Sequence, residues 1–174
     1  MKKIAIIGTL LLVSLSLFSQ QNTVKWYNFE EAIELNKTNP KKILIDVYTD
    51  WCGYCKIMDN RTFKNKDIAR YINENFYAVK LNAESREPIE FAGRTYKWIA
   101  QGNKGYHELA AVLLNGKMSY PSIVYMNEKN QFITTVPGYR KPKEIEPILN
   151  FIAEDHFMKT KWEEYIKTFK STIK

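Results

Sequence analysis

Cysteine, histidine, glycine and proline are all scarce in this chain, and their scarcity excludes several classes of protein. The 174 residues include two Cys, two His, seven Gly and six Pro. So few Gly and Pro exclude collagen-like and low-complexity chains, and two Cys exclude a small domain held together by disulfides. Hydrophobic residues make up 45% of the chain and charged residues 26%. These values are typical of one folded globular domain with its own hydrophobic core.

The absence of several functional motifs narrows the function further. The chain has no glycine-rich phosphate loop and no Ser-His-Asp arrangement. A zinc site would need two ligands besides the cysteines, and the only histidines, His107 and His156, show no ligand spacing with them. The net charge of +7 comes from lysines scattered among acids, which gives no basic patch for nucleic acid. We therefore expect no metal, no other cofactor and no nucleic-acid partner.

The first twenty residues differ from the rest of the chain. Lys2 and Lys3 precede an apolar run from Ile4 to Phe18, which is the pattern of a secretory signal peptide. The run is shorter than the roughly 20 residues that a membrane span needs. We expect residues 1–20 to be removed and residues 21–174 to form one exported domain, periplasmic or otherwise extracytoplasmic, without stable membrane insertion. An uncleaved N-terminal anchor is the alternative. Disulfides persist in such a compartment.

The two cysteines, Cys52 and Cys55, form a Cys-Gly-Tyr-Cys motif. A bridge across so few residues constrains the unfolded chain little, so a purely structural disulfide is a weak interpretation. The apolar run from Ile43 to Tyr48 predicts a buried strand, and Tyr54 to Asn60 has helical composition. Cys52 would then lie at a helix N-terminus, where unpaired N–H groups favour a thiolate, with Cys55 one turn deeper. The motif predicts a redox dithiol with one exposed nucleophile and one resolving thiol.

Residues 46–56, Asp-Val-Tyr-Thr-Asp-Trp-Cys-Gly-Tyr-Cys-Lys, resemble the active-site strand, loop and helix of the thioredoxin superfamily. Three more segments resemble the family in the expected order: residues 79–82 its third strand, residues 120–122 its cis-proline loop, and residues 137–138 the turn after its last strand. The resemblance covers about residues 24–157. It implies an α/β protein with the thioredoxin fold, in which helices flank a central mixed β-sheet.

The resemblance also implies catalytic roles for four residues. Cys52 would be the attacking thiol and Cys55 the resolving thiol. Asp46 corresponds to the buried carboxylate of the family that accepts or relays the proton of the resolving cysteine, and Lys80 to the lysine beside it. The alternatives are that Asp46 is an ordinary acid at a strand end and that Lys80 is a solvated lysine.

A second set of residues is implied to contact the substrate. Tyr120 and Pro121 match the cis-proline loop, in which the residue before the proline offers backbone groups to an extended substrate chain. The alternative for Pro121 is a trans proline at a sheet edge. The loop and helix around the cysteines would supply the remaining contacts, from Trp51, Gly53 and Tyr54.

The direction of electron flow is less well specified than the fold. Gly53-Tyr54 is similar to the centre of the motif in bacterial periplasmic disulfide isomerases. Residues 55–63, however, look more like secreted proteins related to the reducing domain of membrane thiol:disulfide interchange proteins. No segment has the length of the isomerases' dimerisation domain, so we predict a monomeric reductase of protein disulfides that is re-reduced by a membrane or soluble thiol electron donor. The alternatives are an oxidase or isomerase, a non-catalytic peptide-binding module, and a copper chaperone using Met58.

The remaining periodic segments predict the other elements of the fold. Strands are expected at residues 24–27 and 77–81, helices at 28–37, 67–75 and around 145–152, and a hairpin that joins 122–126 to 132–136. Asn28 with Glu31 predicts a capping box at the start of the first helix. The order agrees with the thioredoxin fold.

Two segments are additional to a minimal thioredoxin. An insertion at about residues 84–119 precedes the proline loop and predicts one hairpin, 88–91 with 94–99, followed by a helix at 106–114. We interpret it as a specificity element, because long insertions in compact domains are usually functional; the alternative is a cap on a sheet edge. His107 in that helix could approach the dithiol, although a surface or capping role is the simpler expectation.

The second addition is a helical extension at about residues 157–172. An apolar stripe of Trp162, Tyr165, Ile166 and Phe169 repeats there at helical spacing. The stripe favours packing against the core over partner binding.

Overall fold

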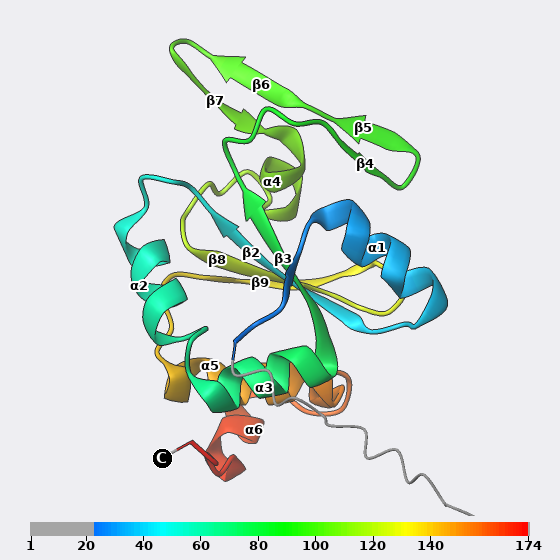
Figure 1. Ribbon diagram of the computed structural model, residues 1–174. Coiled ribbons are helices and arrows are strands. Elements are labelled where there is room, and N and C mark those ends of the chain that lie inside the picture. Colours follow the sequence, from blue (N-terminus) through cyan, green and yellow to red (C-terminus); the bar gives the residue numbers. More distant parts are fainter. Residues whose placement is uncertain (1–22, 174) are drawn as a thin grey trace, which may run out of the picture.

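The computed structural model describes residues 23–173, and a five-stranded mixed sheet with helices on both faces lies at its centre (Figure 1). The strand order is β1-β3-β2-β8-β9. The strands β1 (Trp26–Tyr27), β2 (Lys42–Tyr48) and β3 (Phe76–Asn82) are parallel to one another, and β8 (Ser122–Met126) runs antiparallel to both of its neighbours, β2 and β9 (Phe132–Pro137). The predicted α/β thioredoxin fold is confirmed. The expected signal peptide lies outside the described residues, and no helix within them is long and apolar enough to cross a membrane.

The central strand β2 is buried on both faces, which explains its nearly continuous apolar sequence. Because side chains alternate along a strand, Ile43, Ile45 and Val47 pack on one face, against α1 (Phe29–Thr38) and α4 (Glu108–Leu113). Leu44 packs on the other face, in the cluster formed with α2 (Gly53–Arg61), α3 (Lys66–Asn75) and α5 (Pro142–Ala153). Asp46 follows the alternation of Leu44 and so interrupts this second apolar layer with a carboxyl group.

The helices predicted at residues 28–37, 54–60 and 67–75 are confirmed with ends shifted by at most one residue, and α5 begins three residues before the predicted 145 and ends one residue after 152. The Asn28 side chain accepts a hydrogen bond from the Glu31 N–H at 2.7 Å and begins α1. Asn65 does the same for α3, accepting from the Asp67 and Ile68 N–H groups. The hairpin of β8 and β9 also forms as predicted, with a register shift beside Tyr125.

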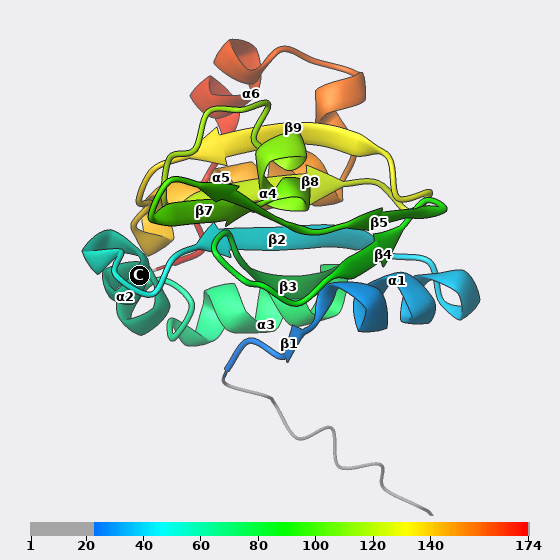
Figure 2. The ribbon, with the colours of Figure 1, turned by 90° about the horizontal axis from the view of Figure 1, so that it is seen from above.

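The insertion differs from the prediction, because it contains two hairpins and a shorter helix. The first pairs β4 (Ile89–Phe91) with β5 (Arg94–Tyr96), and the second pairs β6 (Trp98–Gln101) with β7 (Lys104–His107). Both form two-stranded sheets of their own, separate from the central sheet, and lie over it when the molecule is seen from above (Figure 2). The expected helix start is wrong: residues 106 and 107 end β7, and α4 begins at residue 108.

The close contact between Trp98 and Gly105 explains the second hairpin. A Cβ atom on Gly105 would lie 2.1 Å from Trp98 Cζ2 and 2.5 Å from the Ile99 carbonyl oxygen. Only glycine therefore allows the indole ring to lie across β7. The turn between the two strands includes Gly102, whose φ of 60° lies in the left-handed region that glycine adopts without strain.

The C-terminal extension packs on α5 through aromatic rings. It contains a short 3-10 helix, His156–Met158, and α6 (Trp162–Thr168). The Phe151 ring lies 5.3 Å from Trp162 and 4.9 Å from Tyr165, centroid to centroid. No residue of α6 is fully buried, and Phe169 follows the helix rather than belonging to it. The aromatic contacts agree with packing as the role of the stripe.

The last residues of the chain return to α5 and are held by Glu146. This carboxylate is 5% exposed; it accepts hydrogen bonds from the Thr172 N–H and hydroxyl at 2.7 Å each and from the Ser171 hydroxyl. The adjacent Ile173 is buried in the cluster between the sheet, α3 and α5. Burial alone would raise the pKa of Glu146, but these hydrogen bonds hold it below its ordinary value.

This arrangement predicts a pH-dependent contribution to stability. Because the pKa of Glu146 is depressed in the folded state, the contribution is complete above the unfolded pKa of about 4.3 and is lost as pH falls through the folded pKa. We expect Glu146→Gln to lower the free energy of unfolding by about 1–2 kcal/mol at neutral pH, and by less below about pH 4. Urea unfolding of both proteins at several pH values measures the difference. Glu163→Gln, an exposed residue of α6, is the control; an equal loss there would contradict the role of Glu146.

Candidate active site

The two cysteines form a disulfide at the N-terminus of α2, with an S–S distance of 2.13 Å. Cys52 is the N-cap residue, and its Sγ accepts a hydrogen bond from the Cys55 N–H at 3.1 Å. The exposed nucleophile expected from the sequence is wrong for this oxidised form, because Cys52 is only 5% exposed and Cys55 2%.

The backbone between β2 and α2 fixes the position of Cys52. The chain leaves β2 after Tyr48, and the Cys52 N–H donates to the Thr49 carbonyl at 3.1 Å. The Cys52 carbonyl then accepts the first hydrogen bond of the helix, from the Lys56 N–H at 3.3 Å. The sulfur is thus held at the positive end of a helix dipole, where negative charge on it is stabilised once the disulfide is reduced.

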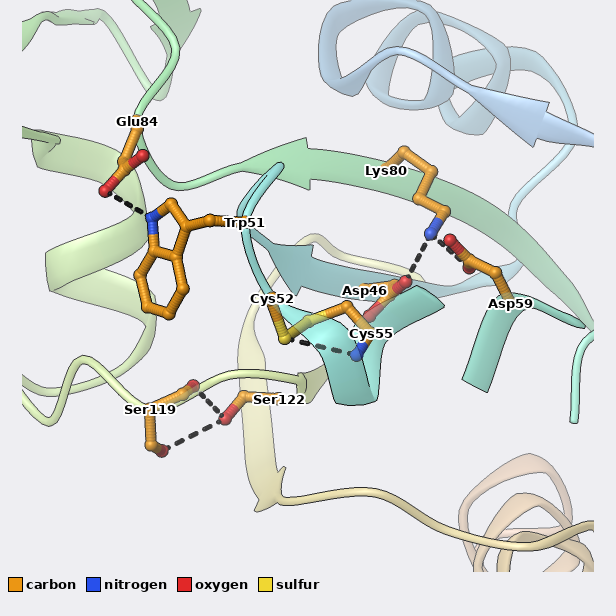
Figure 3. The surroundings of a disulfide bond; sticks show 9 residues. All are labelled: Asp46, Trp51, Cys52, Cys55, Asp59, Lys80, Glu84, Ser119 and Ser122. Carbon is orange, nitrogen blue, oxygen red and sulfur yellow. Dashed lines mark hydrogen bonds and ion pairs between the residues drawn. A yellow bond between two sulfur atoms is a disulfide. The ribbon is translucent and has the colours of Figure 1, made fainter. Parts of the chain in front are cut away.

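A network of three charged side chains lies beneath the helix (Figure 3). Asp46 and Lys80 occupy paired positions of β2 and β3, and Lys80 Nζ lies 2.7 Å from Asp46 Oδ2. The same ammonium group binds Asp59 on α2. Because Asp59 is four residues after Cys55, the two residues share one face of α2. The network therefore joins the central sheet to the helix face that carries the second cysteine.

Burial raises the pKa of the Asp46 carboxyl group from 3.8 to about 6. The charge of Lys80 opposes this shift, and the negative charge of Asp59 adds to it. The residue is 1% exposed, and its Oδ1 atom has no hydrogen-bond partner among the described residues. Asp46 can therefore gain or lose a proton close to neutral pH, as a group that relays protons must.

Lys80 is not the solvated lysine of the alternative interpretation. Its side chain is 21% exposed, and Nζ lies 4.8 Å from the centroid of the Tyr48 ring and 5.0 Å from that of Trp26. Burial alone would lower the pKa of Lys80, but the carboxylates of Asp46 and Asp59 raise it. The side chain therefore stays charged and compensates the carboxylate in the sheet. Likewise, Asp46 is a buried residue within β2 rather than a solvated acid at a strand end.

The two aromatic residues beside the cysteines in the sequence, Trp51 and Tyr54, lie at the surface. Trp51 is 67% and Tyr54 65% exposed. Trp51 Nε1 donates to Glu84 Oε1 at 3.0 Å, and its ring meets the edge of Tyr120 at 6.0 Å between centroids. Gly53 is exposed, and no atom lies within 4 Å of the position that a Cβ would occupy. The predicted substrate-contacting residues of this segment are thus available at the surface.

The proline loop lies where the sequence predicted it, immediately before β8. The Tyr120-Pro121 peptide bond is cis, as expected. The Pro121 carbonyl accepts a hydrogen bond from the Gly138 N–H at 2.7 Å, and the Ser122 hydroxyl donates to the Ser119 carbonyl at 2.8 Å. These bonds hold the loop against the end of β9. The contact between Tyr120 and Trp51 brings it beside the cysteine motif.

Sequence reasoning missed two residues of the site. Asp59 could have been found, because a carboxylate four residues after Cys55 lies on the same helix face. Glu84 had no signal in its neighbouring residues, because its contact with Trp51 depends on the pairing of β2 with β3, which places the ends of the two strands side by side.

Two residues considered for other roles have structural ones. His107 is fully buried, and its Nδ1 accepts from the Leu109 N–H at 3.2 Å, so it caps α4. The expectation that His107 caps a helix is confirmed, and the expectation that it lies at the surface is wrong. Met58 is buried in the core cluster, as its helical position indicated. Within residues 23–173, no group of three or more His, Cys, Asp or Glu side chains could hold a metal ion.

Comparison with known proteins shows which residues of this chain are similar to a known family and to individual proteins. The family model described as "Thioredoxin-like domain" matches residues 29–153. Mouse spermatogenesis-associated protein 20 is 30% identical over 86 residues, which is 49% of this chain and 11% of that protein. The thiol:disulfide interchange protein DsbD of Campylobacter jejuni is 33% identical over 55 residues, 32% of this chain and 10% of that protein. The chain thus matches about a tenth of the length of these curated relatives.

A solved structure agrees at the level of the fold. A thioredoxin-fold protein from Helicobacter pylori superposes with a TM-score of 0.58 at 21% identity and covers 86% of this chain and 88% of its own. The superposition includes most of the segments described above.

The pKa of Asp46 predicts how the stability of the oxidised protein depends on pH. In the folded state the carboxyl group keeps its proton up to about pH 6, but in the unfolded chain only up to about pH 4. The stability that this proton contributes is therefore complete below about pH 4 and lost as pH rises through 6. Asp46→Asn cannot ionise, so its stability relative to the wild type should rise between those values by about 3 kcal/mol. Urea unfolding of the oxidised proteins measures this difference.

Asp59→Asn is the matched control for this experiment. The negative charge of Asp59 raises the pKa of Asp46, so its removal should keep the pH-dependent step and move it to lower pH. A difference between Asp46→Asn and the wild type that does not vary with pH would show that Asp46 does not titrate in this range.

Proposed function

The chain belongs to the thioredoxin-like family, and from this premise we propose that it is an exported thiol:disulfide oxidoreductase that reduces protein disulfides. The observation that carries the proposal is the disulfide at the start of α2, with Cys52 as the N-cap residue and the Asp46–Lys80–Asp59 network beneath Cys55. This arrangement supplies a stabilised thiolate, a second thiol within reach of the first, and a carboxyl group that titrates close to neutral pH. Export is proposed from the composition of residues 1–20.

In the first step of the proposed reaction, the Cys52 thiolate attacks one sulfur of a substrate disulfide. A bond forms between Cys52 Sγ and that sulfur, the substrate disulfide breaks, and the other substrate sulfur leaves as a thiolate that takes a proton from water. In the second step, Cys55 gives its proton to Asp46 and attacks Cys52 Sγ. The Cys52–Cys55 disulfide forms, the second substrate sulfur leaves as a thiolate that takes a proton from water, and Asp46 returns its proton to water, so two electrons and two protons have passed to the substrate.

The direction of the reaction is supported by similarity rather than by geometry. Residues 55–63 resemble secreted relatives of the reducing domain of interchange proteins, and the Campylobacter relative is described as a thiol:disulfide interchange protein. A reductase must be returned to its dithiol form after each cycle. We propose that a membrane or soluble thiol donor does this by the same two exchange steps in reverse, and that the protein works as a monomer.

The reduction potential of the Cys52–Cys55 pair tests the direction. We expect a value near the roughly −270 mV of thioredoxin, because a reductant of protein disulfides must itself be readily oxidised. Equilibration with glutathione or dithiothreitol buffers, followed by thiol alkylation and mass spectrometry, measures it. A value above about −180 mV would contradict the reductase proposal and favour an oxidase or isomerase.

The assigned order of attack predicts which variant traps the substrate. Cys55→Ser lacks the resolving thiol, so it should accumulate a mixed disulfide between Cys52 and the substrate, detectable by mass on a non-reducing gel. Cys52→Ser should form no such adduct and should reduce insulin at less than about a hundredth of the wild-type rate. Insulin reduction by Cys52→Ser at the wild-type rate would instead indicate a peptide-binding module with an incidental dithiol.

A further inference from the structure

A pocket of about 410 Å³ lies beside the cysteine motif, between the active-site loop and the inserted second hairpin. Trp51, the residue before Cys52, lines one side of it, and Trp98 of β6 and Lys104 of β7 line the other. Glu84 and Arg86, from the segment between β3 and β4, also line it. Because Trp51 also contacts Tyr120 of the proline loop, the pocket adjoins the surface on which a substrate would lie.

The pocket is held in shape by specific contacts. Trp51 is fixed by its hydrogen bond to Glu84, which turns the indole away from the charged network and toward the insertion (Figure 3). The Trp98 ring occupies space that only Gly105 leaves open. The Arg86 guanidinium carbon lies 4.6 Å from the centroid of the Trp98 ring, a cation–π contact that holds this side chain beside the pocket.

The charges of the pocket favour an anionic partner. Arg86 and Lys104 are exposed and form no ion pair with any carboxylate of the described residues. The one carboxylate in the wall, that of Glu84, accepts the Trp51 N–H. The lining thus holds two cations without an ion-pair partner in residues 23–173 and one carboxylate beside the rings of Trp51 and Trp98, so its net charge is positive, and a guanidinium can bind a carboxylate through two N–H groups.

We propose that this pocket selects the substrate: it binds an acidic side chain that lies within a few residues of the cysteine to be reduced. This inference rests on the proposed function and names the class of protein disulfide that the enzyme prefers. Arg86 would bind the substrate carboxylate, Lys104 would add to the attraction, and the indole rings of Trp51 and Trp98 would pack against the aliphatic part of the same chain. The insertion would then act as a specificity element.

Matched peptides test the proposal. In each peptide one cysteine is joined to 2-mercaptoethanol as a mixed disulfide. A single Glu or Lys stands either two residues before or two residues after that cysteine. Stopped-flow mixing with the reduced protein gives the rate of peptide release. At low ionic strength we expect at least about a fivefold preference for Glu over Lys on one side of the cysteine, falling to less than about twofold in Arg86→Gln/Lys104→Gln. Lys129→Gln/Lys143→Gln, which removes the same charge far from the pocket, should keep the preference.

The possible outcomes separate this inference from the proposed function. Equal rates for Glu and Lys peptides with the wild-type protein would overturn it, and so would equal losses of preference in both double variants, since steering by net charge would then suffice. If the protein reduces neither the peptides nor hydroxyethyl disulfide, the proposed function fails. Binding then decides the inference without redox chemistry: the Glu peptide with Cys→Ser should shift the indole N–H signals of Trp51 and Trp98 in NMR spectra of the oxidised protein, and no shift would overturn it.

Discussion

A carboxyl group buried in the central strand constrains the geometry of the whole active-site end. Asp46 lies on a strand that is covered on both faces, and its ionised form is tolerated only with a compensating cation. Lys80 supplies that cation because the parallel register of β2 and β3 places it directly beside Asp46. The same ammonium group binds Asp59 and so ties α2 to the sheet. The position of the disulfide over the sheet therefore depends on this one buried charge and on its strand register.

The catalytic part of the site could be predicted from the sequence because its determinants are local. A buried strand, a short loop and a helix that begins at Cys52 follow one another in the chain, so the spacing of Asp46, Cys52 and Cys55 fixes their relative placement. The surroundings of Trp51 could not be predicted in this way. Its partner Glu84 is distant in sequence and is brought to it by the pairing of β2 with β3, which extends to a hydrogen bond from the Ala83 N–H to the Tyr48 carbonyl.

The second inserted hairpin also shows that sequence alone did not predict structure that depends on tertiary packing, here over only a few residues. The pattern predicts that a helix begins at residue 106, yet residues 104–107 form β7, and over so few residues an apolar pattern suits a strand equally well. Pairing with β6 decides the outcome, and that pairing depends on the space that Gly105 leaves for Trp98. A glycine at a helix start and a glycine beneath an aromatic ring look alike in the sequence. Tertiary packing distinguishes them.

The strand order also governs when the site can form during synthesis. On one side β2 pairs with β3, which follows soon after it in the chain, but on the other side it pairs with β8, where Asp46 is opposite Ile123. A nascent chain that has reached only the end of β3 carries both cysteines and the Asp46–Lys80 register, yet one edge of its central strand is open. The carboxyl group then remains hydrated, and its proton affinity is that of an ordinary acid. The dithiol thus acquires its chemical environment late, when the strand made about 75 residues after Asp46 closes the sheet.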